Sequence, residues 1–172
     1  MTKHPSNLVL IGMPGSGKST VGIILAKKTS LSFVDTDVLI QASQQQSLQN
    51  IVDTQGYAAL RKIEEALLLG LSLQNHVIAT GGSAVYSDNA MNHLKSDGRI
   101  VFLDVDINTL TRRIGDFSAR GIAKRPGQSF AELFEERLTL YKRHADITIN
   151  GAEMTHEAVC DTIINEMNRY LH

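Results

Sequence analysis

The sequence predicts an α/β domain in which helices cover both faces of a parallel β-sheet. Three observations support this fold class. Short apolar segments of strand length alternate with longer segments of helical spacing along the whole chain. The first apolar segment is followed directly by a glycine-rich loop and the start of a helix. The chain has 172 residues, of which 42% are hydrophobic and 20% are charged, so we expect residues 1–172 to form one domain with a single core.

Five short apolar segments are predicted to form the sheet. Each is a nearly continuous apolar run, which is typical of parallel strands that are buried on both faces. The expected strands are Asn7–Ile11, Leu31–Val34, His76–Ala79, Ile100–Asp104 and Ala145–Ile149. Between them, apolar residues three and four positions apart predict helices. The expected helices are Val21–Lys28, Val38–Ala42, Leu48–Thr54, Tyr57–Leu73, Ser87–Ser96, Asn108–Ile114, Ser129–His144 and a last helix from Thr155 to about Tyr170.

The loop after the first expected strand, Gly12–Ser19, matches G-x-x-x-x-G-K-[ST] at every fixed position. Its glycines let successive backbone N–H groups point at a phosphate chain, and the following helix adds its positive end. In this motif the lysine, Lys18, reaches the β- and γ-phosphates, and the hydroxyl of Ser19 binds Mg²⁺. A plain turn would have to match all four fixed positions by chance. The motif therefore predicts a nucleotide-phosphate site formed by Gly15, Ser16, Gly17, Lys18, Ser19 and Thr20.

Two carboxylates, Asp35 and Asp37, follow the second expected strand. Open α/β sheets bind their ligands at the carboxyl ends of the strands, and residues two apart can face the same crevice. One carboxylate could hold Mg²⁺ through water, while the other orients or deprotonates a substrate hydroxyl. The alternative is a structural role, in which Thr36 or Asp37 caps the helix that begins near Val38.

The longest expected helix carries one arginine beside its apolar side. The expected buried residues of this helix are Ala59, Leu60, Ile63, Ala66, Leu67 and Leu71. Arg61 lies next to them, and Glu64 and Glu65 follow it by three and four positions. On helical spacing alone, this arrangement predicts a solvated ion pair at the surface.

Two later segments have the composition of a ligand site. Gly81-Gly82 follows the third strand, where a glycine pair either permits close approach of a ligand or simply forms a tight turn. Residues 116–128 are basic, weakly apolar and punctuated by glycine. A stretch of this kind is uncommon in a compact domain, and beside a phosphate loop it predicts a lid that brings cations over the transferred phosphoryl group. The alternative is a solvated loop.

Several classes of protein are disfavoured. The net charge of −1 and pI of about 6.6 provide no basic field for nucleic acid or an anionic membrane. The single cysteine, Cys160, permits neither an internal disulfide nor a zinc cluster, and we expect it in the core. The N-terminus has no signal-like apolar segment and no run has transmembrane length, so we expect a cytoplasmic protein. Asp53–Gly56 fits the D-x-x-G of nucleotide-dependent switches, but no N-K-x-D-type guanine motif accompanies it.

Taken in order, these motifs resemble the shikimate kinase family along nearly the whole chain. The resemblance rests on Gly12–Thr20, Asp35–Asp37, Gly56–Arg61, Gly81-Gly82, Arg120 and Glu136–Tyr141. It implies strand order 2-3-1-4-5, a lid as in nucleoside monophosphate kinases, and a mobile substrate-binding subdomain at about residues 36–65. The chain departs from the family pattern in three places. Ser83 replaces a third glycine, Gly121-Ile122 replaces Pro-Leu after Arg120, and Leu60 replaces phenylalanine; Gly-Gly-Ser and Arg-Gly-Ile resemble one branch of the family.

The resemblance also implies roles for the nucleotide and metal residues. Asp35 would contact Mg²⁺ together with Ser19, directly or through water. Arg120 would descend with the lid onto the transferred group. Arg113 and the turn at Asn150 would lie near the adenine of ATP.

For the acceptor, the resemblance implies a small carboxylated polyol. Asp37 would bind its hydroxyls, and Gly81 and Gly82 would offer backbone amides. Arg61 and Arg137 would bind its carboxylate, which reverses the surface interpretation of Arg61. Lys18, Asp37 and Arg120 would thus be catalytic in transfer of the γ-phosphoryl group of ATP to the 3-hydroxyl of shikimate. The alternatives are a related kinase that acts on another small hydroxy acid or sugar acid, and a nucleotide-dependent switch. We expect a monomer with a small-molecule substrate.

Overall fold

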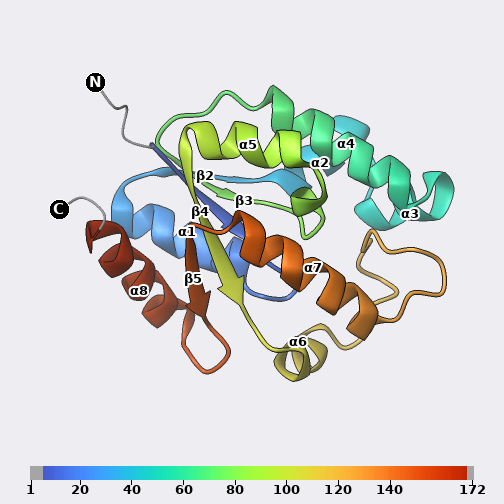
Figure 1. Ribbon diagram of the computed structural model, residues 1–172. Coiled ribbons are helices and arrows are strands. Elements are labelled where there is room, and N and C mark those ends of the chain that lie inside the picture. Colours follow the sequence, from blue (N-terminus) through green and yellow to red (C-terminus); the bar gives the residue numbers. More distant parts are fainter. Residues whose placement is uncertain (1–5, 170–172) are drawn as a thin grey trace.

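The computed structural model describes residues 6–169, which form a three-layer α/β/α domain around one parallel sheet (Figure 1). The strands lie in the order β2-β3-β1-β4-β5, so the order 2-3-1-4-5 is confirmed. The central strand β1 pairs with β3 on one side and β4 on the other, with Val9 opposite both Ile78 and Ile100. The strands are β1 (Asn7–Ile11), β2 (Ser32–Asp35), β3 (His76–Ala79), β4 (Gly98–Asp104) and β5 (Ile147–Asn150).

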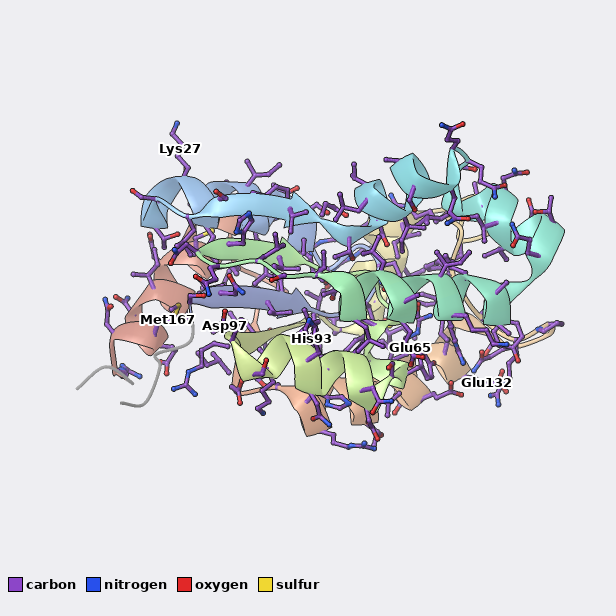
Figure 2. The ribbon with its side chains drawn as sticks, turned by 90° about the horizontal axis from the view of Figure 1, so that it is seen from above. Lys27, Glu65, His93, Asp97, Glu132 and Met167 are labelled. Carbon is purple, nitrogen blue, oxygen red and sulfur yellow. The ribbon has the colours of Figure 1, made fainter. Side chains whose placement is uncertain are left out.

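The helices cover both faces because alternate residues of each strand point to opposite sides of the sheet. Leu8 and Leu10 pack with α1 and α8, whereas Val9 and Ile11 pack with α4, α5 and α7. Polar side chains such as Lys27 of α1 point outward (Figure 2). The helices are α1 (Lys18–Thr29), α2 (Thr36–Gln44), α3 (Leu48–Gln55), α4 (Tyr57–Gly70), α5 (Asp88–Ser96), α6 (Ile107–Ile114), α7 (Phe130–His144) and α8 (His156–Arg169), with a 3₁₀ turn at Ala84–Tyr86.

Most expected elements are present, with shifted ends. β4 begins at Gly98 rather than Ile100, and α4 ends at Gly70, three residues before Leu73, because Leu71 is extended. The expected end of the last helix at Tyr170 lies outside the described residues. The capping box of Ser129 and Glu132 is present at α7, and Cys160 is buried in the core as expected.

The expected buried residues of α4 are partly wrong. The fully buried residues are Leu60, Glu64 and Leu68, each four positions after the last, while Ala66 is exposed. This difference rotates the buried side of the helix and brings a carboxylate inside the protein. Within residues 6–169, none of the helices is long and apolar enough to cross a membrane.

Candidate active site

A cleft of about 790 Å³ opens beyond the carboxyl ends of the strands, where the P-loop, the segment after β3 and residues 120–123 meet. It brings together most of the residues that the sequence singled out. The predicted site residues lining this cleft are Gly15, Gly17, Lys18, Ser19, Thr20, Asp37, Gly81, Gly82, Arg113, Arg120 and Arg137. Ser16, Asp35, Arg61 and Asn150 are placed around it, as described below.

The P-loop curls over the N-terminus of α1. Gly15 and Gly17 have φ values of 81° and 97°, a conformation that glycine adopts without steric cost. The ammonium group of Lys18 donates hydrogen bonds to the carbonyls of Gly12 (2.8 Å) and Met13 (2.9 Å), and lies 3.5 Å from the hydroxyl of the buried Ser16. Burial lowers the pKa of Lys18 to about 8, against the opposing effect of Asp37. The lysine is therefore held across the loop by acceptors that a phosphate group can replace.

Asp35 contacts both the P-loop and α2. One carboxylate oxygen accepts a hydrogen bond from the hydroxyl of Ser19 (2.5 Å), and the other accepts from the amide of Asp37 (2.9 Å). Asp35 is thus the N-cap of α2, and the alternative that Thr36 or Asp37 caps this helix is wrong, because the helix already begins at Thr36. The hydroxyl of Ser19 and the carboxylate of Asp35 are hard oxygen ligands of the kind that Mg²⁺ takes.

Gly81 and Gly82, which follow β3, lie close to charged side chains of the cleft. A Cβ atom at Gly81 would lie 2.7 Å from a carboxylate oxygen of Asp37, and one at Gly82 would lie 2.6 Å from a guanidinium nitrogen of Arg137. The amide of Gly81 donates to the hydroxyl of Thr36 (3.2 Å), so this amide is already bonded. A side chain at either position would therefore displace Asp37 or Arg137 from its place in the cleft.

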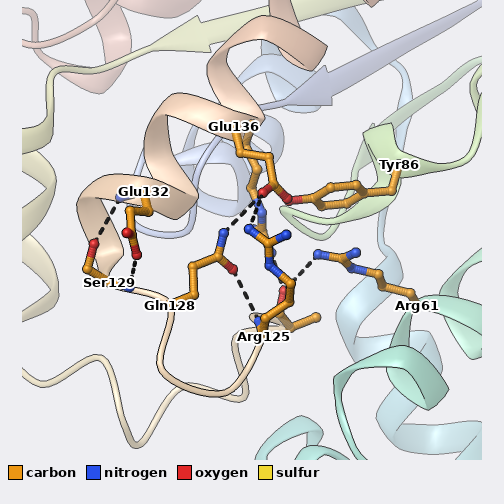
Figure 3. A network of polar contacts seen from close by, with 9 residues as sticks. Arg61, Tyr86, Arg125, Gln128, Ser129, Glu132 and Glu136 are labelled. Atoms are coloured by element: carbon orange, nitrogen blue, oxygen red, sulfur yellow. Dashed lines mark hydrogen bonds and ion pairs between the residues drawn. The ribbon is translucent and has the colours of Figure 1, made fainter.

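The two arginines that the resemblance singled out converge on one point, although they lie on different helices. Arg137 of α7 and Arg61 of α4 donate to the same carbonyl, that of Ala123, at 2.9 Å and 3.4 Å. Arg137 is 1% exposed, and the Nε atoms of both residues are buried without a hydrogen-bond partner. The surface pair of Arg61 with Glu64 or Glu65 that spacing predicted is wrong, since the guanidinium group of Arg61 turns inward over Tyr86 (Figure 3).

The middle of the segment 116–128 lies against α3. The amide of Gly121 donates to the side chain of Gln49 (2.6 Å), and a Cβ atom at Gly121 would lie 2.5 Å from the backbone nitrogen of Gln49. Ile122 and Ala123 are buried, while Arg120 is exposed and lines the cleft. The segment is therefore not a solvated loop throughout.

Of two other residues predicted to bind the nucleotide, Arg113 lines the cleft and Asn150 lines a separate groove. Arg113 donates to the carbonyl of Gly15 (3.4 Å), and Asn150 ends β5 beside an open groove of about 1020 Å³. His156, at the start of α8, lines the main cleft against Gly17 and was missed by the sequence analysis. Asp53 of the D-x-x-G segment lies on the surface of α3, where it accepts from Gln49 (2.7 Å). That position does not support a nucleotide-dependent switch.

The chain matches one family of known proteins along most of its length. The family model described as "Shikimate kinase" matches residues 14–168, nearly the whole chain. This chain belongs to the shikimate kinase family. The shikimate kinase of Sulfurihydrogenibium sp. is 36% identical over 164 residues, which cover 95% of this chain and 98% of that protein.

Two solved shikimate kinases have the same fold. The enzyme from Acinetobacter baumannii, solved in complex with shikimate, matches with a TM-score of 0.85 and 25% identity over 98% of this chain and 96% of that one. The enzyme from Aquifex aeolicus matches with a TM-score of 0.81 and 36% identity over 94% and 96% of the two chains. As a member of this family, the chain is a phosphotransferase that uses ATP.

Glu64 is a buried site residue of this shikimate kinase that sequence spacing assigned to the surface. It is 3% exposed and lines the cleft, and the hydroxyl of Ser83 donates to it. Ser83 is the residue that stands in place of the third glycine of the family. Burial raises the pKa of Glu64 to about 7, although the Ser83 hydrogen bond opposes this shift. The spacing of Glu64 from Leu60 and Leu68 was the signal that could have placed it inside.

We expect the raised pKa of Glu64 to make folding stability depend on pH. The folded protein binds this proton more tightly than the unfolded chain, so the contribution is full below pH 4.5 and is lost as pH rises through about 7. Relative to Glu64→Gln, the wild type should lose about 2 to 3 kcal/mol of unfolding free energy between pH 5 and pH 8. Urea denaturation of both proteins at the two pH values measures this. Glu65→Gln controls for the charge, and parallel stabilities of wild type and Glu64→Gln would contradict the assignment.

Proposed function

We propose that this shikimate kinase transfers the γ-phosphoryl group of ATP, with Mg²⁺, to the 3-hydroxyl of shikimate. The observation that carries the proposal is the convergence of Arg61 and Arg137 on the carbonyl of Ala123, a residue that lines the cleft together with the P-loop. Two guanidinium groups aimed at one point offer paired donors for a carboxylate. Shikimate has both a carboxylate and ring hydroxyls, so it can reach from the arginines to the P-loop.

At the nucleotide end, we propose that Gly15, Ser16, Gly17 and Thr20 bind the phosphates, with Lys18 on the β- and γ-phosphates. Arg113 and Asn150 would hold the adenine side. Ser19 and Asp35 would hold Mg²⁺, because a hydroxyl and a carboxylate are hard oxygen ligands and these two already lie within hydrogen-bonding distance of each other. When bound, Mg²⁺ would offset charge on the phosphate groups.

At the acceptor end, Asp37 would align the attacking hydroxyl and accept its proton. Burial raises the pKa of Asp37, while the neighbouring Lys18 opposes that shift and favours the carboxylate. Gly81 and Gly82 would let the substrate approach the backbone closely, and Arg120 would offset charge on the transferred group. Catalysis of this kind consists mostly of positioning and charge neutralisation.

We also propose that residues 36–65 move as a substrate-binding subdomain within the single domain. These residues have a small core of their own, separate from the two cores that flank the sheet. Its buried members are Ile40, Ile51, Leu60 and, from the segment 116–128, Ala123. We also propose that the protein acts as a monomer.

Residues 116–128 are expected to act as a lid. Their amide hydrogens should exchange more slowly when an unreactive ATP analogue and shikimate are both bound, because closure buries this segment. Hydrogen exchange with and without the two ligands measures the effect, with residues 160–169 of α8, away from the cleft, as the internal control. Equal exchange of residues 116–128 in both states would make the segment an ordinary loop.

The acceptor itself is tested by coupled ADP release with ATP and a panel of small hydroxy acids and sugar acids that includes shikimate. We expect shikimate to give the highest kcat/KM of the panel. A higher kcat/KM for another acid would identify that acid as the acceptor, in line with the departures from the family pattern at Ser83 and Gly121. ADP release that no acid stimulates would contradict the kinase assignment.

A further inference from the structure

Arg61 has little hydrogen bonding to fix its orientation. It is half-buried, its hydrogen bond to Ala123 is long at 3.4 Å, and its Nε atom has no hydrogen-bond partner among residues 6–169. Its closest aromatic contact is instead Tyr86, the last residue of the 3₁₀ turn that follows the Gly81-Gly82 segment. The guanidinium carbon of Arg61 lies 3.6 Å from the centre of the Tyr86 ring, a close cation–π contact.

Tyr86 also lies beside the second arginine. The guanidinium carbon of Arg137 is 5.6 Å from the centre of the same ring, so one aromatic ring contacts both groups that converge on Ala123. A second aromatic residue, Tyr57 at the start of α4, is farther from Arg61, at 5.1 Å. Of these two rings, that of Tyr86 therefore makes the closer contact with the guanidinium group of Arg61.

The hydroxyl of Tyr86 connects this contact to the end of the proposed lid. It donates to Glu136 (2.6 Å), whose other carboxylate oxygen accepts from Arg125 (3.0 Å) and Gln128 (3.1 Å) (Figure 3). The Tyr86 hydrogen bond is the largest cause that lowers the pKa of Glu136, which favours the carboxylate. Gln128 is itself buried and accepts from the amide of Arg125 (3.1 Å). One carboxylate therefore holds both Tyr86 and residues 125–128.

We propose that Tyr86 is a positioning residue, which orients Arg61 through its ring and couples Arg61 to the lid through its hydroxyl and Glu136. The inference rests on the proposed acceptor role of Arg61. The proposal gives one side chain two separable functions. The ring increases the affinity for the substrate carboxylate, and the hydroxyl stabilises residues 125–128 at the end of the proposed lid.

Kinetics of two variants test the role of the ring. Tyr86→Leu removes ring and hydroxyl, and we expect it to raise the KM for shikimate about five- to tenfold, as loss of a cation–π contact would, with the KM for ATP within about twofold. Tyr86→Phe keeps the ring and should restore the KM for shikimate to within about threefold of wild type. Tyr57→Leu removes the more distant ring, at 5.1 Å, and should raise this KM less than Tyr86→Leu does. An unchanged KM in Tyr86→Leu, or equal increases in both Tyr86 variants, would overturn the role of the ring.

Hydrogen exchange tests the role of the hydroxyl and requires no turnover. In Tyr86→Phe, residues 125–128 should exchange faster than in the wild type, while α8 is unaffected; unchanged exchange would overturn the link to the lid. Failure of the proposed function would look different. In that case the wild type would not phosphorylate shikimate, or Arg61→Lys would keep the wild-type kcat/KM for shikimate. A wild type that fails on shikimate still leaves the exchange comparison decisive for Tyr86.

Discussion

Lys18→Met is expected to lower kcat by at least about a hundredfold, the scale found when one charge-stabilising donor is removed from an active site. The ammonium group of Lys18 lies within the P-loop, where it donates to the carbonyls of Gly12 and Met13. Methionine has a similar length but offers neither charge nor donors. The γ-phosphoryl group would therefore lose its main protein cation during transfer.

The same substitution should weaken the fold without destroying it. The carbonyls of Gly12 and Met13 each lose a hydrogen-bond donor, which costs at most about 1–3 kcal/mol of folding stability per carbonyl. The sequence did not indicate this structural role of Lys18. Circular dichroism and urea denaturation report folding, and a steady-state assay reports turnover. Lys27→Met, on the outer side of the same helix, is the matched control and should behave as wild type. A folded Lys18→Met protein with near-normal turnover would refute the kinase mechanism.

The second large effect is expected at the paired arginines. Arg61→Lys and Arg137→Lys should each lower kcat/KM for shikimate roughly ten- to more than a hundredfold, since a lost charged hydrogen bond costs about 1.5–3 kcal/mol. Lysine keeps the charge but lacks the planar fork of donors that fits a carboxylate. Arg137→Lys should have the larger effect, because Arg137 is 1% exposed and makes the shorter hydrogen bond to Ala123.

Nucleotide binding separates this account from general damage. Neither arginine is assigned to ATP, so the Kd for an ATP analogue should stay within about twofold in both variants. Arg143→Lys is the matched control on α7, because Arg143 lies on the surface beside Asp88. If Arg61→Lys keeps normal acceptor kinetics, its carboxylate-binding role is wrong and the case for a shikimate-like acid loses its main support.

The parts of the site that the sequence predicted are those with a contiguous pattern. The P-loop is one segment of eight residues. Its motif predicts a strand before it, a helix after it, and the phosphate-binding groups that lie between them. The alternation of apolar and helical segments likewise predicts a parallel sheet. The order of the strands has no such local signal, and it was available only through the resemblance to a family.

The parts that the sequence missed depend on how helices rotate and begin. Glu64 was assigned to a surface ion pair because i+3 spacing is ambiguous, whereas rotation of α4 by tertiary packing brings it into the cleft beside Ser83. Asp35 caps α2 because the helix begins one residue after β2 ends. Tyr86 carried no motif, and its contact with Arg61 joins two separate helical segments. The positions of Glu64 and Tyr86 depend on packing between elements that are separate in sequence, whereas the cap at Asp35 depends on where a helix begins.

The identity of the product is the most direct test of whether this protein phosphorylates the 3-hydroxyl of shikimate. The purified protein would be incubated with ATP, Mg²⁺ and shikimate, and the product analysed by mass spectrometry and by ³¹P and ¹H NMR. The account predicts one new phosphate ester on the 3-hydroxyl of shikimate, formed in step with ADP and absent from the Lys18→Met reaction. Recovery of unmodified shikimate, or a phosphate ester at another hydroxyl, would contradict it.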